Sequence, residues 1–164
     1  MAAIATTATQ KSHALLTGGT GLAYTVAALS VREGTALSLI EPGQVMAQRI
    51  QPDVAERSAG VTYPAVYVYC EGVTNQLREK FRTFSGKVSM AMEARVTHDR
   101  IEKLTAALHL YTAAITEVLD THRGDWGNGM FYTGGYKIEY GPVKHGGRNF
   151  VQTARITYEV DVSL

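Results

Sequence analysis

The sequence predicts an α+β fold: a mostly antiparallel sheet of about four strands, packed with one long helix and one or two shorter helices. Two observations predict it. Residues 149–164 and 88–96 alternate apolar and polar side chains, as strands with one buried face do. Residues 101–119 repeat apolar side chains at helical spacing. Strands and helices in this order favour a sheet that is covered by helices.

Length and composition favour a single domain. A chain of 164 residues can bury one sizeable core, and 45% hydrophobic with 19% charged residues is typical of a folded protein. We expect a flexible N-terminal arm over residues 1–21, which are small and polar, and one α+β domain over residues 22–164. The start lacks the basic residues of a signal peptide, and no apolar run approaches the ~20 residues that span a bilayer. We therefore expect no membrane contact and synthesis in the cytoplasm.

The first part of the expected domain is only partly assignable. A short helix is expected over residues 22–32, and Gly34 should end it. Residues 45–50 suit either a short strand or a turn. Residues 52–53 are a turn signal, and residues 56–60 suit an exposed loop.

The pattern becomes clearer from residue 63 onwards. Residues 64–70 are β-branched and aromatic, which predicts a strand. A polar segment over residues 71–80 separates it from the alternating strand over residues 88–96. The only cysteine, Cys70, lies inside the first run, so we expect a small buried side chain and no disulfide within the chain.

The long helix is expected to begin after Asp99, which can cap it together with Glu102, and to run to about Thr121. One face carries large side chains and should lie on the sheet. It comprises Ile101, Leu104, Leu108, Tyr111, Ile115, Val118 and Leu119. A narrow polar edge is expected to face water. It comprises Glu102, Thr105, His109, Thr112, Thr116 and Asp120.

The remaining face of this helix is rich in alanine. Two interpretations remain open for it: exposed alanine that favours helix formation, or a surface that accepts another helix or a neighbouring subunit at close range. Leu110 in its middle favours contact. The candidate subunit-interface residues are Ala106, Leu110, Ala113 and Ala114.

The last part of the chain predicts two more strands, over residues 136–140 and 149–164, joined by a loop over residues 141–148. Basic side chains gather around this loop, which suits a solvated hairpin tip or a contact with an acidic partner or nucleic acid. They are Lys137, Lys144, His145 and Arg148. The net charge of +1 argues against a surface that mainly neutralises phosphate. The outward carboxylates of the strands should pair across strands with Arg95, Lys137 and Arg155. These carboxylates are Glu93, Glu139, Glu159 and Asp161.

Two short motifs resemble motifs of nucleotide-cofactor enzymes. Residues 17–21 read Thr-Gly-Gly-Thr-Gly, but Tyr24 occupies the position where such a turn needs a small side chain, and no β/α series follows. Tyr140 and Lys144 have the spacing of a Tyr-x-x-x-Lys pair, but Gly141 and the following proline disfavour the helix it needs. No two of the five histidines have the i,i+4 spacing of a metal pair. We therefore predict no catalytic, cofactor-binding or metal-binding residues.

Three segments together resemble the tail-terminator (tail-completion) and neck proteins of long-tailed bacteriophages. They are residues 63–69, residues 84–96, and residues 136–162, with the long helix between the second and third. The resemblance covers roughly residues 63–164.

The resemblance implies a structural virion protein and no catalysis. Such proteins form a ring, usually of six copies, at the head-proximal end of the tail tube. The ring ends tube growth and joins the tail to head-completion proteins, and DNA passes through its lumen without sequence-specific binding. The basic residues Lys137, Lys144, His145 and Arg148 would then be the candidate contacts with the lumen or with an adjacent ring. The expected places are then the virion tail or neck, and the host cytoplasm during assembly. The alternatives are a head–tail adaptor or stopper, a nucleic-acid-binding module and, more distantly, a nucleotide-cofactor-binding enzyme.

Overall fold

The computed structural model describes residues 3–51 and 61–164, and a curved eight-stranded sheet, a half-barrel, forms their centre. The strand order is β1-β2-β3-β8-β5-β4, and β6 and β7 also pair with β8. The strands are β1 (Val45–Met46), β2 (Ala65–Asn75), β3 (Ser85–His98), β4 (Gly124–Gly127), β5 (Met130–Tyr132), β6 (Tyr136–Tyr140), β7 (Lys144–Gly146) and β8 (Asn149–Ser163). The described residues form three α-helices, α1 (Ala3–Thr17), α2 (Leu22–Glu33) and α4 (Ile101–Thr121), and a 3-10 turn at Pro42–Gln44.

The prediction of about four mostly antiparallel strands is wrong. The sheet is mixed, because β1 runs parallel to β2, and it contains short strands that the sequence does not predict. Strands β4, β5 and β7 have only three or four residues each, too few for alternation to be visible in the sequence. Strands β5 and β7 pair with β8, which is 15 residues long and whose second edge needs hydrogen-bond partners along its length, and β4 pairs with β5.

Strands β3 and β8 form the middle of the sheet, and the alternation predicted in both is confirmed. Every residue of the 14-residue β3 has an antiparallel partner in β8, from Ser85 opposite Ser163 to His98 opposite Phe150. Their apolar side chains form the core beneath the helices. They are Val88, Met90, Met92, Ala94, Val96, Ala154, Ile156, Tyr158, Val160 and Val162.

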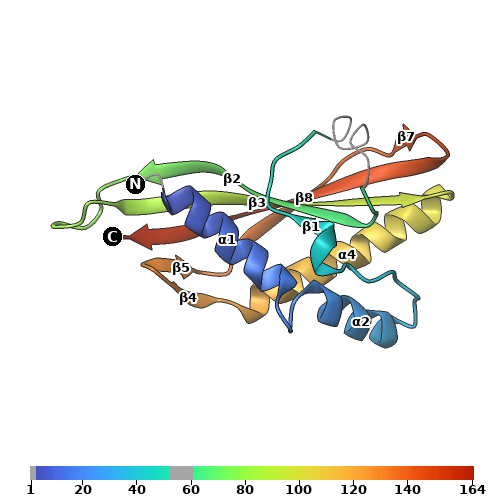
Figure 1. The fold of residues 1–164 in the computed structure, drawn as a ribbon, viewed down its shortest axis with the longest axis horizontal. Coiled ribbons are helices and arrows are strands. Elements are labelled where there is room, and N and C mark those ends of the chain that lie inside the picture. Colours follow the sequence, from blue (N-terminus) through green and yellow to red (C-terminus); the bar gives the residue numbers. More distant parts are fainter. Residues whose placement is uncertain (1–2, 52–60) are drawn as a thin grey trace.

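The helices form the second layer. Helix α1 contacts β2 and β3, helix α4 contacts β3 and β8, and α2 packs against α4 (Figure 1). The β2–β3 loop projects from one end of the long axis, whereas β7 and the start of α4 lie at the other end (Figure 1).

Helix α1 replaces the flexible arm that we expected over residues 1–21. It buries one side chain per turn, at Ile4, Ala8, Ser12 and Leu16. Two of these are small, so the helix lies close to the sheet, and the Tyr158 hydroxyl donates a hydrogen bond of 2.6 Å to Ser12 Oγ. The small side chains of this segment therefore indicate close packing of a helix on the sheet, and not a flexible chain.

A glycine turn connects α1 to α2. Gly18 N donates to the carbonyl of Ala14, and Gly21 N donates to the carbonyl of Gly18. A Cβ atom at Gly21 would overlap the carbonyl oxygen of Leu16, so only glycine fits there. The helix predicted over residues 22–32 is confirmed as α2, and Gly34 ends it in the left-handed conformation with φ 64°.

The long helix is confirmed, but its expected cap is wrong. Helix α4 ends at Thr121, and its N-cap residue is Arg100, without a side-chain capping bond. The Asp99 carboxylate instead lies 2.7 Å from His98 Nδ1. The predicted faces are also partly wrong, since Ile101 of the expected sheet-facing side is exposed and Thr112 of the expected polar edge is buried.

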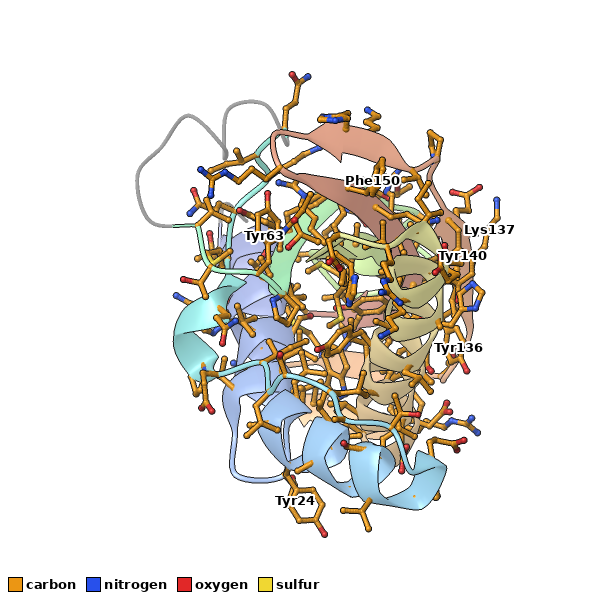
Figure 2. All side chains as sticks on the ribbon, turned by 90° about the vertical axis from the view of Figure 1, so that its right-hand side faces the viewer. Tyr24, Tyr63, Tyr136, Lys137, Tyr140 and Phe150 are labelled. Atoms are coloured by element: carbon orange, nitrogen blue, oxygen red, sulfur yellow. The ribbon has the colours of Figure 1, made fainter. Side chains whose placement is uncertain are left out.

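Strand β6 explains part of this difference, because its last residue, Tyr140, contacts the polar edge of α4. The Tyr140 hydroxyl lies 2.9 Å from Thr112 Oγ1, and its ring packs edge-on against His109 (Figure 2). Thr105 Oγ1 donates to Gln152 Oε1 of β8. The edge that we expected to face water is therefore hydrogen-bonded to the sheet at Thr105 and Thr112, whereas Glu102, His109 and Asp120 are exposed as expected. The turn expected at residues 52–53 and the loop at 56–60 lie outside the described residues.

Candidate functional site

The face of the sheet that α1 and α4 do not cover is lined by polar and charged side chains, and we call it the polar sheet face. The β3 and β8 register places these side chains side by side, because each is opposite a partner of the same parity. They are Lys87, Ser89, Glu93 and Arg95 of β3, and Arg155, Thr157 and Glu159 of β8. Tyr67 and Tyr69 of β2 complete it.

Glu93 accepts hydrogen bonds from two other side chains of this face. Its Oε1 accepts a hydrogen bond of 2.6 Å from the Tyr69 hydroxyl, and its Oε2 accepts one of 2.9 Å from Arg95 Nη2. Burial, and then the hydrogen bond to Glu93, raise the pKa of Tyr69, so this phenol stays neutral and remains a donor. Arg49 lies over the Tyr69 ring, 5.0 Å from its centroid.

Arg95 is a buried cation. Its side chain is 1% exposed, and its guanidinium lies 4.1 Å from the centroid of the Tyr67 ring. It also donates to the carbonyl of Ile50, which holds the segment after β1 against this end of the sheet. Among the described residues, Nε and Nη1 of Arg95 and Nε of Arg155 have no hydrogen-bond partner.

A β-bulge brings one further carboxylate to this face. The β2–β3 register shifts between Cys70 and Gly72, and the extra residue, Glu71, forms an ion pair with Arg155 across β3. Ala91 is the small β3 side chain between them. Cys70 is half-buried rather than buried, and burial raises the pKa of its thiol, so this thiol is not an activated nucleophile.

The expected cross-strand pairs of Arg95, Lys137 and Arg155 with the four named carboxylates are wrong, and Arg155 pairs with Glu71 instead. Lys87 pairs with Glu159 across strands at 2.5 Å. Glu139 pairs with Lys137 at 2.7 Å, and Glu93 pairs with Arg95, but both partners lie two positions away on the same strand. The polar sheet face therefore satisfies most of its charges internally.

A shallow cavity of about 480 Å³ lies on this face, between β6 and the bulge. Its charged lining is balanced, with Glu71 and Glu159 against Lys137 and Arg155. Balanced charges that already form ion pairs give no preference for an anion or a cation.

The structure divides the predicted basic cluster. Lys144 and His145 lie on β7, Arg148 lies in the turn before β8, and all three are exposed. Lys137 lies on β6 opposite Thr157, six positions along β8 from the partner of Lys144, a separation of about 20 Å.

The predicted alanine face of α4 is also divided. Ala106 and Ala113 are exposed, and Leu110 is half-buried against the core. Ala114 is fully buried inside the chain and has no surface to offer a neighbour. Only the first three remain candidates for a subunit contact.

Two exposed apolar surfaces were not predicted from the sequence. One is the tip of the β2–β3 loop, with Leu77 and Phe81, which lies largely in a segment that we read only as polar. The other is an outward stripe of α2, consisting of Tyr24, Ala27, Ala28 and Val31. The i, i+3, i+4, i+7 spacing of this stripe was the available signal.

The motifs of a cofactor enzyme lack their structural context. Residues 14–16 lie in α1, so the glycine turn joins two helices and does not follow a strand. Tyr140 ends β6 and Lys144 begins β7, so no helix carries this pair. Within residues 3–51 and 61–164, no group of three His, Cys, Asp or Glu side chains could hold a metal ion.

The sequence matches no protein-family model and none of the curated proteins. In the described part of the chain, no single helix has the length and apolar composition to cross a bilayer. Helices α1 and α2 meet that criterion only as a pair bent by 41°.

Proposed function

We propose that this protein is a structural subunit of a bacteriophage virion, which forms a ring of six copies at the head-proximal end of the tail tube. The ring ends tube growth and joins the tail to the head-completion proteins. One observation carries the proposal: the three segments that resemble tail-terminator and neck proteins are neighbours in one unit. They correspond to β2, β3 and β6–β8, and α4 packs on β3 and β8.

The polar sheet face supports this role. DNA that moves through a ring needs a wall that does not hold phosphate strongly, because each phosphate contact with a free cation adds affinity. Here Lys87 and Arg155, the accessible cations of this face, each have a carboxylate partner, and Arg95 is buried. A surface neutralised in this way suits a lumen that DNA passes through without sequence-specific binding.

The β7–β8 hairpin remains the candidate contact with the lumen or with an adjacent ring. Lys144, His145 and Arg148 are exposed at its tip, and Lys144 and Arg148 form no ion pair with the described residues. An acidic rim on the tail tube or on a head-completion protein would complement them.

Electron microscopy of tail tubes tests the proposal. Tubes assembled from the tail-tube protein of the same phage should carry a ring at one end, and should stop growing, when the purified protein is added. Binding to head-completion proteins without capping of tube ends would identify a head–tail adaptor or stopper. Binding to neither would overturn the proposal.

Charge reversal at the hairpin tip sharpens this test. If Lys144→Glu/Arg148→Glu loses capping, the hairpin contacts the adjacent ring, and if capping is unchanged, the hairpin faces the lumen or the solvent and makes no contact that capping needs. Lys103→Glu is the matched control, since Lys103 is an exposed cation on α4.

A further inference from the structure

The β2–β3 loop presents two large apolar side chains to solvent. Phe81 is 104% exposed and Leu77 is 64% exposed, relative to the fully accessible residue. Both have positive φ, 67° and 46°, which bulky residues rarely adopt. Backbone of this kind persists only when the surrounding structure holds it, and it is typical of functional sites.

Hydrogen bonds hold this loop to the end of the sheet. Asn75 Oδ1 accepts from the backbone N–H groups of Leu77 and Ser85, both at 3.1 Å, and Asn75 Nδ2 donates to the carbonyl of Thr83. The N–H group of Thr83 donates to the carbonyl of Leu164 at 2.8 Å. The loop therefore has a fixed shape before any partner binds, which lowers the entropy cost of association.

A hollow lies beside the loop. It has a volume of about 340 Å³, and its lining includes Arg78 of the loop, Phe131 of β5 and Asp161 of β8. Phe131 is 49% exposed, so a second aromatic ring is accessible next to the loop. Arg78 and Asp161 form no ion pair with each other or with another described residue. This end of the protein thus combines a projecting apolar tip with a small concave surface.

The charges of the loop favour an acidic partner. The loop carries three cations, Arg78, Lys80 and Arg82, against one carboxylate, Glu79. Glu79 is already engaged by Arg82, whose Nε lies 3.5 Å away. Arg78 and Lys80 form no ion pair with the described residues, so two free cations oppose the single free carboxylate of Asp161. Carboxylates on a partner would complement this excess of positive charge.

A protein surface fits this combination better than a lipid or a nucleic acid does. Aromatic and arginine side chains are the residues in which protein interfaces are enriched. A fluid lipid surface gains nothing from the fixed backbone of Leu77 and Phe81, and it would have to accept Glu79, which lies between them in the chain. A single-stranded nucleic acid stacks successive bases on several rings, whereas the loop itself offers one.

The loop lies at the opposite end of the long axis from the β7–β8 hairpin (Figure 1). It can therefore reach a component that the hairpin does not reach. We infer that the loop inserts Phe81 and Leu77 into an apolar pocket with an acidic rim on the component that adjoins the ring at this end. This inference rests on the proposed function and deepens it, because it assigns one of the two neighbours of the ring to a specific surface of the subunit.

Binding to each neighbour tests the contact. The tail-tube protein and the head-completion proteins of the same phage are immobilised separately, and binding of the full chain is measured by biolayer interferometry. Phe81→Ser should weaken binding to one of the two at least about tenfold, with unchanged circular dichroism, and leave binding to the other unchanged. Tyr24→Ser should change neither, and it is the matched control because Tyr24 is an exposed aromatic residue that points away from the body of the protein on α2 (Figure 2).

Salt separates the apolar part of the contact from the charged part. Arg78→Glu/Lys80→Glu should weaken the same binding step, and its loss relative to the unchanged protein should shrink as ionic strength rises. The loss in Phe81→Ser should persist at high salt, because the burial of an apolar ring is not screened. Arg100→Glu/Lys103→Glu reverses two exposed cations at the start of α4, near the other end, and is the charge-matched control.

The outcomes distinguish the inference from the proposed function. If the unchanged protein binds neither neighbour, both are overturned. If it binds and caps tubes, and Phe81→Ser binds both neighbours equally well, only the inference is overturned. A loss of binding to both neighbours would place Phe81 in the assembly of the ring itself and would also overturn the inference. Unchanged protein binding in Phe81→Ser, together with lost binding to phosphatidylglycerol vesicles, would assign the loop to a lipid surface instead.

Discussion

The guanidinium of Arg95 lies 4.1 Å from the centroid of the Tyr67 ring, and the same side chain donates to Glu93 at 2.9 Å. A cation that is almost wholly removed from water thus combines an aromatic contact with an ion pair. Its loss leaves a half-buried carboxylate without its cation, and such uncompensated charges are costly.

We expect Arg95→Met to lower the free energy of unfolding by about 3 kcal/mol in urea titration. The double variant Arg95→Met/Glu93→Gln should recover part of this loss, because no unpaired charge remains. Lys87→Met should cost less than about 1 kcal/mol, since the Lys87–Glu159 pair is solvent-exposed. Equal losses for the two single variants would contradict a buried role for Arg95.

The buried tyrosines predict a loss of stability at alkaline pH. Burial, and then the charge of Asp120, raise the pKa of Tyr132 to about 12, and burial also raises the pKa of Tyr158. Between pH 10 and 12 the unfolded chain loses these phenolic protons while the folded chain keeps them, so folding stability falls as the pH rises. Each tyrosine contributes at most about 1.4 kcal/mol per pH unit.

Urea midpoints between pH 10 and 12 measure this effect. Tyr132→Phe should flatten the alkaline decline, because the phenylalanine ring does not titrate. Tyr24→Phe should leave it unchanged, since Tyr24 is exposed. A decline of equal slope in Tyr132→Phe would exclude Tyr132 as its source.

Helix α1 should be an integral part of the folded domain. Ala8→Asp places a charge at a fully buried position against the sheet and should cost more than about 3 kcal/mol, or prevent folding. Thr6→Asp, at an exposed position of the same helix, should change stability by less than about 0.5 kcal/mol. Thermal unfolding would measure both. If Ala8→Asp left the stability unchanged, the result would support the flexible arm that the sequence predicts.

The alanine face of α4 makes a separate prediction. Ala114→Asp should unfold the protein, since Ala114 is fully buried, whereas Ala113→Asp should leave the unfolding curve unchanged. Mass photometry of Ala113→Asp then tests the remaining surface. An oligomer of unchanged size and affinity would remove that face from the list of contacts.

Long periodic segments were predictable from the sequence, and short or small-residue segments were not. Strands β3 and β8 and helix α4 follow directly from their alternation and spacing, because each is long enough to show a period. Helix α1 was missed because its buried stripe includes Ala8 and Ser12, which carry almost no hydropathy signal. The burial of Thr112 depends on Tyr140, which is distant in sequence, so the helix alone could not predict it.

The candidate surfaces show the same limit. Sequence alternation placed the charged residues on one face, but the bulge at Glu71 that neutralises Arg155 has no local signal. In the sequence, Phe81 is a single apolar residue among charged residues. Its exposure depends on the fold of the loop, which the sequence does not show.

Strand β8 follows every other strand in the chain, yet it joins β3 to β5, β6 and β7. During synthesis on the ribosome, the sheet cannot close until this segment has left the exit tunnel. Until then β3 has an open edge, and open strand edges promote aggregation. Translation rate and chaperone supply should therefore influence the soluble yield of this protein.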